Sequence, residues 1–263
     1  MSLRSVILLA ALIFAIRPAM AAWHTQSVEW ELDGETFSGV LVYDKSTDAA
    51  RPGIVMVPNW MGVNEAAVER AREIAGTRYV VLVADVYGKN VRPADTREAS
   101  AQAGRMYADR SVLRARAAKA LEVLRANADA APLSGDRPGA VGFCFGGTTV
   151  LELARSGAEL AGVVSLHGGL KTDLPASAKP AASILVLNGA ADTYVAPEEI
   201  AAFQQEMDKA QADWQFVNYA GAVHCFAEAN AASPPGCVYH PLAAKRAFAA
   251  MHEFFDEVFS ANK

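Results

Sequence analysis

The sequence predicts an α/β fold in which helices cover both faces of a mostly parallel β-sheet. Short apolar runs, typical of strands buried on both faces, alternate with segments of helical periodicity. The chain has 263 residues, of which 52% are hydrophobic and 20% charged, enough for one domain with a sizeable core. The first two strand-like segments flank Asp33-Gly34, a hairpin signal, so the sheet is expected to be mixed.

The elements are assigned in chain order from their hydrophobic patterns. The hairpin should consist of strands 27–32 and 36–43. The strands expected after it are 53–57, 80–84, 140–143, 161–166, 184–187 and 214–219. The helices expected are 65–75, 110–125, 147–154, 197–210 and a long last helix carrying Phe248, Met251, Phe255 and Val258 on one face. In such sheets ligands bind at the carboxyl ends of the strands, so these ends are where functional residues are sought.

The charge pattern gives no sign of a nucleic-acid partner. The net charge is −5, the pI is about 5.6, and no cluster of Lys and Arg suited to tracking phosphates is visible. The densest basic stretch is interpreted as the solvated face of an amphipathic helix, opposite an apolar face. Its basic residues are Arg105, Arg110, Arg114, Arg116 and Lys119, and its apolar residues are Leu113, Ala117, Ala120, Leu121 and Leu124.

The first 21 residues have the pattern of a secretory signal peptide. Arg4 precedes an apolar run from Val6 to Ile16, and Ala19-Met20-Ala21 offers small residues for cleavage after Ala21. This run is shorter than the about 20 residues that span a bilayer. We therefore expect a secreted or periplasmic domain of residues 22–263 without a stable membrane anchor. The alternative is an N-terminal anchor or a buried helix.

The three cysteines are an odd number, so at least one thiol stays outside intramolecular pairing. Export would place them in an oxidising compartment. Cys225 and Cys237 are twelve positions apart, with Pro234, Pro235 and Gly236 between them. A short disulfide loop between these two would leave Cys144 free, whereas the alternative keeps all three reduced. The sequence leaves this question open.

Residues 142–147, Gly-Phe-Cys-Phe-Gly-Gly, match the G-x-S-x-G nucleophile elbow with Cys144 in place of serine. The motif lies where a predicted strand turns into a helix. Glycines on both sides relieve the crowding of a sharp turn, and the helix N-terminus favours a thiolate. The alternative is a glycine-rich turn that holds a buried structural cysteine. The glycine patterns of phosphate-binding loops are not met.

A thiol nucleophile needs a base and a group that orients the base, and in this fold class the acid precedes the histidine along the chain. His224 follows the last predicted strand and is the preferred base. Its rival, His167, also ends a strand but precedes the candidate acid, and it is interpreted as a satisfied, half-buried histidine under the pocket. Asp192 follows a buried strand and is expected to hold one tautomer of His224, although a turn or capping role is the alternative.

The oxyanion formed in the reaction needs hydrogen-bond donors. The backbone N–H of Phe145 follows the nucleophile, and a second N–H should come from the loop after strand 53–57, where Trp60 is best placed. The alternative role for the Trp60 side chain is an aromatic lid, which is compatible with backbone donation. An apolar pocket is expected to be lined by Trp60, Met61, Tyr194 and Phe226.

Several further motifs lie in one order along residues 53–255. They are Gly142 to Gly147, Met61 to Asn64, Asp85 to Lys89, Gly189 to Asp192, Gly221 to His224 with Phe226, and Tyr239 ahead of Ala243-Ala244. Together they resemble the dienelactone hydrolase family. The resemblance implies an eight-stranded α/β-hydrolase fold, a triad of Cys144, Asp192 and His224, and no metal or organic cofactor.

The chain departs from the founding members of that family at its substrate positions. Those members carry a Glu, which takes the thiol proton, where this chain has Asn59, and Asn cannot accept a proton at neutral pH. They also bind a substrate carboxylate with Arg and Ser, at positions that match Lys89, Cys225 and Glu228 here. Since Glu228 would repel an anion, a substrate with a free carboxylate is not expected. The founding enzymes are cytosolic, unlike an exported chain.

The sequence thus predicts a hydrolase that cleaves a small-molecule ester, lactone or thioester through an acyl-Cys144 intermediate. Substrate contacts are expected from Asn59, Met61, Lys89, Tyr194 and Phe226. The first alternative is a non-catalytic binding protein on the same fold. The second is a periplasmic thiol-redox protein, disfavoured because no C-x-x-C motif is present. The oligomeric state and the physiological substrate are not indicated.

Overall fold

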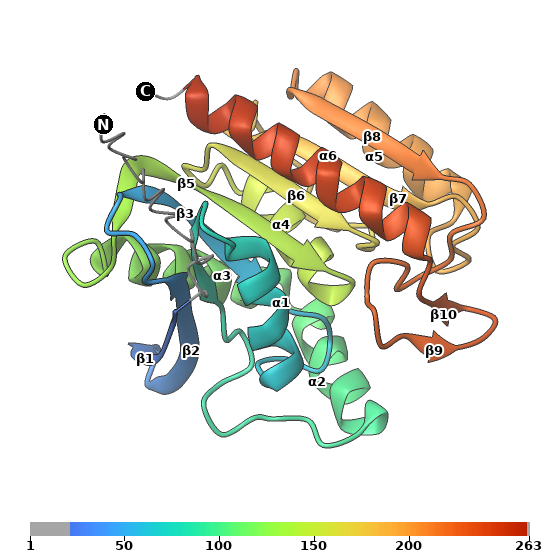
Figure 1. Ribbon diagram of the computed structural model, residues 1–263. Helices are drawn as coiled ribbons and strands as arrows, with labels where there is room; N and C mark the ends of the chain where they lie inside the picture. Colours follow the sequence, from blue (N-terminus) through green and yellow to red (C-terminus); the bar gives the residue numbers. More distant parts are fainter. Residues whose placement is uncertain (1–21, 262–263) are drawn as a thin grey trace, which may run out of the picture.

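The computed structural model describes residues 22–261 and contains an eight-stranded sheet in the order β1-β2-β4-β3-β5-β6-β7-β8 (Figure 1). The predicted signal peptide, residues 1–21, lies outside the described residues. The strands are β1 Trp23–Leu32, β2 Glu35–Asp44, β3 Arg51–Val57, β4 Val80–Val83, β5 Leu133–Phe143, β6 Gly162–Leu166, β7 Ser183–Gly189 and β8 Trp214–Tyr219. β2 pairs antiparallel with β1 and β4, and the other neighbours are parallel, so the mixed sheet that the hairpin predicted is confirmed.

Six helices are described, and they cover the two faces of the sheet (Figure 1). They are α1 Glu65–Ala75, α2 Thr96–Ala108, α3 Arg110–Ala126, α4 Phe145–Arg155, α5 Pro197–Lys209 and α6 Pro241–Ser260. Apolar residues of α1 and α6 form one core cluster, and those of α2 to α5 form the other. Along β3, Ile54 and Met56 join the first cluster while Val55 and Val57 join the second, because successive strand residues point to opposite faces. No helix in the part of the chain that the structure describes is long and apolar enough to cross a membrane.

The pattern-based assignment missed α2 and the two-stranded sheet of β9, Ala232–Ser233, and β10, Cys237–Val238. α2 buries only Ala99, Ala103 and Met106, too weak an apolar stripe to stand out in an alanine-rich sequence. Its start is fixed instead by Asp95, whose side chain accepts a hydrogen bond from the Glu98 N–H at 2.8 Å.

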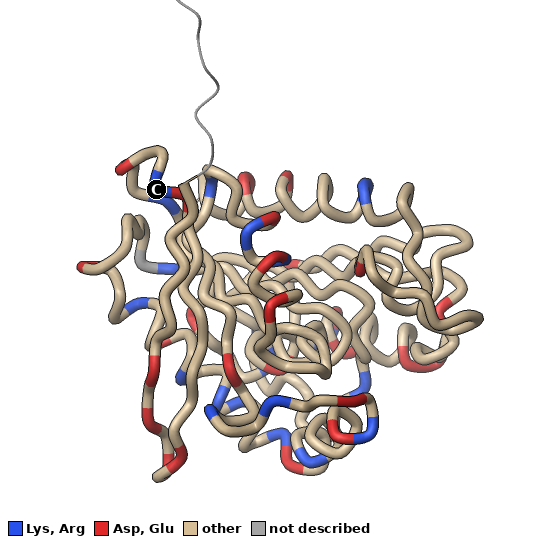
Figure 2. Tube along the Cα trace, turned by 60° about the horizontal axis from the view of Figure 1, so that its bottom comes forward, with Lys and Arg blue, Asp and Glu red and all other residues tan. Residues whose placement is uncertain are grey.

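The basic residues before and along α3 are not all on a solvated face, so that interpretation was wrong. The side chains of Arg110, Arg114 and Arg116 are only 11%, 18% and 14% exposed. Arg110 and Arg114 pair at 3.6 and 2.7 Å with Glu152, whose carboxylate is fully buried in α4, and Arg116 pairs with Glu35. A buried carboxylate requires partners, which draws Arg110 and Arg114 inward. Figure 2 shows basic and acidic residues interspersed along the helices at its lower edge. The apolar face predicted for the helix is buried.

Candidate active site

Cys144, Asp192 and His224 lie together at the carboxyl edge of the parallel strands. Cys144 follows β5 directly, Asp192 lies three positions after the end of β7, and His224 lies five positions after the end of β8. Because β5 to β8 are neighbours in the sheet, three segments distant in sequence meet at one edge. The three side chains that the sequence singled out are thus brought together by the strand order.

Cys144 occupies a sharp turn between β5 and α4. Its backbone has φ 53° and ψ −116°, a conformation that L-residues rarely adopt. A Cβ on Gly142 would lie 2.0 Å from the Gly146 carbonyl oxygen, and a Cβ on Gly146 would lie 2.0 Å from the Val57 carbonyl oxygen. Only glycine fits at these two positions, so the close packing of the turn explains the glycines of the motif.

A continuous chain of hydrogen-bonding groups links the three side chains. His224 Nδ1 donates to Asp192 Oδ2 at 2.7 Å, and His224 Nε2 lies 3.1 Å from Cys144 Sγ. The other carboxylate oxygen of Asp192 accepts the Tyr194 N–H at 2.8 Å. Asp192 is therefore held by two contacts. It fixes the tautomer of His224 that carries its proton on Nδ1, and the Nε2 atom of this tautomer faces the thiol.

The protonation of His224 is set by opposing influences. Burial lowers the pKa of His224, whereas hydrogen bonds to Asp192 and Cys144, together with the charges of these two groups, raise the pKa. The pKa-raising contacts prevail and bring the pKa of His224 to about 10. The site therefore favours an imidazolium beside the sulfur, which is the arrangement that stabilises a thiolate.

His167, the rival candidate for the base, contacts the backbone of Cys144 and is completely buried, whereas the sequence predicted a half-buried residue. Its Nδ1 accepts the backbone N–H of Cys144 at 3.2 Å, and its Nε2 has no partner among the described residues. Burial, reinforced by the charges of His224 and Arg70, holds the pKa of His167 well below its usual range. A neutral ring that contacts the backbone of the turn supports Cys144 and does not reach its sulfur through a hydrogen bond.

Phe145 and Trp60, the two residues expected to donate backbone N–H groups to the oxyanion, line the same pocket as Cys144. Phe145 is the first residue of α4, and Trp60 lies in the turn after β3. The backbone N–H groups of these two residues have no acceptor within residues 22–261. The turn is shaped by the Gly62 N–H, which donates to the Asn59 carbonyl at 2.9 Å. Tyr87 Oη, from the loop after β4, donates to the Trp60 carbonyl at 3.1 Å. Both predicted oxyanion donors thus border the same pocket as Cys144.

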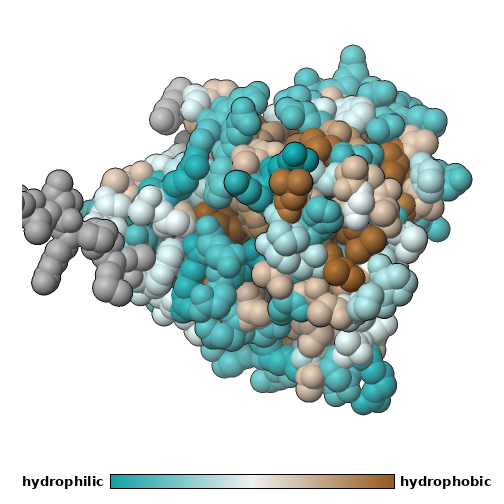
Figure 3. All heavy atoms as spheres, turned by 45° about the vertical axis from the view of Figure 1, so that its right-hand side comes forward, coloured by the Kyte–Doolittle hydropathy of each residue, from teal (hydrophilic) through white to brown (hydrophobic). Residues whose placement is uncertain are grey.

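This pocket has a volume of about 430 Å³ and a mostly apolar lining. Trp60, Tyr107 and Tyr194 supply aromatic rings, and Tyr194 is 66% exposed at the opening. The charged residues at its wall are Arg110, Lys171 and Glu199. Figure 3, which brings the right-hand side of Figure 1 forward, shows apolar side chains surfacing in patches among polar ones. Tyr107 was missed by the sequence analysis because its helix, α2, was not predicted.

Four of the five expected substrate residues do not line this pocket, and Phe226 and Lys89 are the first two. Phe226 is fully buried in the core, and its ring lies 5.4 Å from that of His167. Lys89 forms an ion pair with Glu29 on β1 at 2.9 Å. These two expectations are corrected: the apolar ring of Phe226 is used for packing, and Lys89 pairs with an acidic residue of the hairpin.

Asn59 and Met61 line a separate cavity of about 110 Å³. Its lining includes both chain neighbours of Trp60 but not Trp60 itself, and its polar wall includes Arg70 and Glu228. Neither Asn59 nor Met61 is among the residues that line the pocket of Cys144. The expectation that Asn59 and Met61 line the substrate pocket is therefore corrected, since both line the separate cavity.

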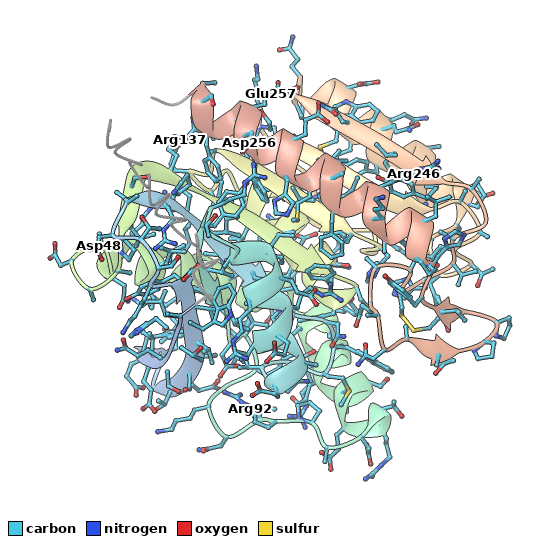
Figure 4. The ribbon with its side chains drawn as sticks, viewed as in Figure 1. Asp48, Arg92, Arg137, Arg246, Asp256 and Glu257 are labelled. Carbon is cyan, nitrogen blue, oxygen red and sulfur yellow. A yellow bond between two sulfur atoms is a disulfide. The ribbon has the colours of Figure 1, made fainter. Side chains whose placement is uncertain are left out.

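Cys225 and Cys237 form a disulfide, the pairing that the sequence had left open (Figure 4). Cys144 is the free cysteine of the described residues. The disulfide lies beside the site, since both of its cysteines line the pocket and the Val238 N–H donates to the His224 carbonyl at 3.1 Å. The described part of the chain contains no group of three or more His, Cys, Asp or Glu residues that could hold a metal ion.

The sheet order and the nucleophile elbow define an α/β-hydrolase. The sequence model of the dienelactone hydrolase family matches residues 37–259, and the chain belongs to that family. Both the fold class and the hydrolase class predicted from the sequence are confirmed, so the chain is an enzyme of the ester- or lactone-hydrolysing type.

Solved structures and curated proteins show the same relationship. A structure named m3DLH is 36% identical, with a TM-score of 0.82 over 90% of this chain and 99% of its own. A dienelactone hydrolase-like promiscuous phosphotriesterase from metagenomic libraries is 33% identical, with a TM-score of 0.81 over the same shares. A protein of Salmonella typhimurium, named "Putative carboxymethylenebutenolidase", is 27% identical over 84% of this chain and 83% of its own length.

Proposed function

We propose that the chain hydrolyses a carboxylic ester, lactone or thioester with Cys144 as nucleophile, His224 as base and Asp192 as the group that orients the base. The observation that carries this proposal is the unbroken series Asp192–His224–Cys144, with separations of 2.7 and 3.1 Å, opening into an apolar pocket. Base and nucleophile are within hydrogen-bonding reach before any substrate binds, as nucleophilic catalysis requires.

In the first half-reaction, His224 takes the proton of Cys144 and the thiolate attacks the substrate carbonyl carbon. A C–S bond forms, and the carbonyl electron pair moves to the oxygen. The N–H groups of Phe145 and Trp60 stabilise this oxyanion, at about 3 kcal/mol for each well-aimed donor. As the intermediate collapses, the C–O or C–S bond to the leaving group breaks and His224 returns its proton to the departing alcohol or thiol.

In the second half-reaction, water hydrolyses the acyl-Cys144 thioester. His224 accepts a proton from the water while the hydroxide attacks the acyl carbon, and a second oxyanion forms in the same place. Collapse breaks the C–S bond, releases a carboxylic acid and restores the Cys144–His224 pair. The balance is one water consumed for one ester cleaved, with no redox change.

The decisive experiment compares wild type with Cys144→Ala and Cys144→Ser on p-nitrophenyl acetate. The wild type should show a burst of p-nitrophenol and an acetyl group on Cys144 by mass spectrometry, and Cys144→Ala should show neither. Turnover that persists in Cys144→Ala would end the proposal. Absence of both burst and acyl adduct in the wild type would favour a non-catalytic binding protein, and a thiol-reversible mixed disulfide on Cys144 without esterase activity would favour a redox role.

Phosphotriesters are a second candidate substrate class. They are suggested by the relative at 33% identity that is named a promiscuous phosphotriesterase. The same thiolate and the same two N–H donors suit attack at a tetrahedral phosphoryl centre, where negative charge also develops on oxygen. Release of p-nitrophenol from paraoxon by the wild type, and its loss in Cys144→Ala, would support this activity. Equal rates in both proteins would refute it.

We further propose that residues 1–21 are removed during export and that residues 22–263 act as one domain in the periplasm or outside the cell. The disulfide between Cys225 and Cys237 supports this location, because such bonds persist in oxidising compartments. N-terminal sequencing of protein from the periplasmic fraction should begin at Ala22. Protein that retains Met1 and stays in the cytosol would contradict the proposal.

A further inference from the structure

Glu228 is a partly buried carboxylate that the proposed reaction does not use, and it contacts the turn that carries the Trp60 N–H. Asn59 Nδ2 donates to Glu228 Oε2 at 2.5 Å, although the two residues are 169 positions apart. Burial raises the pKa of Glu228, and the hydrogen bond from Asn59 and the charges of Arg70 and His224 oppose that rise. Asn59 is thus a direct hydrogen-bond partner of a carboxyl group at the back of the site.

Asn59 also shapes the turn itself. Its side-chain Oδ1 accepts the Met61 N–H at 3.0 Å, and its backbone carbonyl accepts the Gly62 N–H at 2.9 Å. The contact with Met61 requires the oxygen of the amide on that side, which directs the NH₂ group toward Glu228. The two amide contacts therefore fix one orientation of Asn59, the residue directly before Trp60.

The backbone of Glu228 is a firm support for this contact. Its N–H donates to the Cys225 carbonyl at 2.9 Å, and its carbonyl accepts the Ala231 N–H at 2.9 Å. Phe226, two positions earlier, is fully buried in the core, and the disulfide from Cys225 to Cys237 closes the segment. The position of Glu228 is therefore fixed by two successive turns, by the buried ring of Phe226 and by the nearby disulfide. Asn59, in contrast, lies in a loop.

Glu228 lines the separate cavity of about 110 Å³ and does not line the pocket of Cys144. It is therefore poorly placed to take the thiol proton or to contact an ester bound at Cys144. The side chain of Glu228 accepts a hydrogen bond from Asn59. The geometry thus favours an indirect role, exerted through the turn.

We infer that Glu228 is a positioning residue that holds the turn 59–62, through Asn59, in the shape that aims the Trp60 N–H at the oxyanion. This inference rests on the proposed function of Cys144. Loss of the Glu228 carboxyl removes the acceptor of the Asn59 NH₂ group, so the side chain can rotate and release the Met61 N–H. A misplacement of about 1 Å costs up to about 100-fold in rate, so Glu228→Ala should slow acylation by about 10- to 100-fold.

The conservative variant Glu228→Gln separates positioning from charge. Its amide oxygen can still accept from Asn59 Nδ2, so its acylation rate should stay within about threefold of wild type. A matched control is Glu257→Ala, which removes the same charge from an exposed site on α6, far from β9 and β10 (Figure 4). Its rates should equal those of the wild type.

The experiment measures three quantities for the full chain. They are the acylation burst with p-nitrophenyl acetate, the steady-state kcat and KM, and the rate at which iodoacetamide alkylates Cys144. Alkylation needs the thiolate but no oxyanion, so Glu228→Ala should leave it unchanged. Because both half-reactions pass through an oxyanion, kcat should fall with the burst rate while KM changes by less than about twofold.

The outcomes separate this inference from the proposed function. A normal wild-type burst with an unchanged Glu228→Ala rate overturns the inference alone, and so does an equal loss in Glu228→Ala and Glu228→Gln. Alkylation that slows in proportion to kcat shows general disruption of the site and also overturns it. A wild type without any burst overturns the proposed function and the inference together.

Discussion

His224 Nε2 lies 3.1 Å from Cys144 Sγ, so the sulfur directly affects the protonation of the imidazole. The hydrogen bond and the charge of Cys144 are among the causes that raise the pKa of His224 to about 10. This one distance therefore has consequences for the titration of His224 and for the reaction proposed above.

Replacement of Cys144 by Ala should lower the pKa of His224. The substitution removes the hydrogen bond and the charge of the sulfur, while burial continues to favour the neutral ring. The imidazole signals of His224 in an NMR titration should therefore shift at a lower pH than in the wild type. Asp192→Asn should act in the same direction, because Asp192 supplies the other raising contact. An unchanged titration in both variants would show that the pKa is not set by these contacts.

Tyr87→Phe should reduce the turnover rate. The Tyr87 hydroxyl donates to the Trp60 carbonyl at 3.1 Å, a contact with the turn that is independent of Glu228. Loss of one hydrogen bond should lower the free energy of unfolding by about 1 kcal/mol. A slightly displaced Trp60 N–H should lower kcat by about tenfold, with KM little affected. Tyr43→Phe, on β2, is the matched control, and equal kcat losses in the two variants would count against the role of Tyr87.

Gly142→Ala should prevent correct folding of the nucleophile turn, because the added Cβ would lie 2.0 Å from the Gly146 carbonyl oxygen. Gly104→Ala is the contrasting substitution, since Gly104 lies within α2 with open space around it. It should stabilise the protein by about 0.5–1 kcal/mol, because Ala is the better helix former. Urea unfolding of both variants tests the pair, and a Gly142→Ala protein as stable and active as wild type would contradict the packing argument.

Reduction of the Cys225–Cys237 disulfide should weaken both stability and activity. Thiol titration of denatured, unreduced protein should find one free thiol, that of Cys144. The closed loop spans 12 positions, for which chain-entropy estimates give a stabilisation of about 3 kcal/mol. Since Val238 supports the His224 carbonyl, Cys225→Ser with Cys237→Ser should also lower kcat. Three free thiols in the denatured protein would exclude the bridge.

The local features of this fold were predictable because they depend on neighbours in the chain. The boundaries of α1 and β8 coincide with those expected from hydrophobic periodicity, and the glycines around Cys144 encode a turn that no other residue fits. Where the local pattern was weak, as in the alanine-rich α2, the helix was not predicted. Tyr107, which lies on that helix, was therefore not among the residues expected to line the pocket.

What the sequence by itself determined is the fold class, the nucleophile turn and the order of Cys144, Asp192 and His224 along the chain. Only the tertiary structure decided which side chains share a cavity: it placed Phe226 in the core, Lys89 against Glu29, and Asn59 against Glu228. The physical reason is that backbone conformation responds to adjacent residues, whereas a contact across 169 positions depends on how the sheet brings separate loops together.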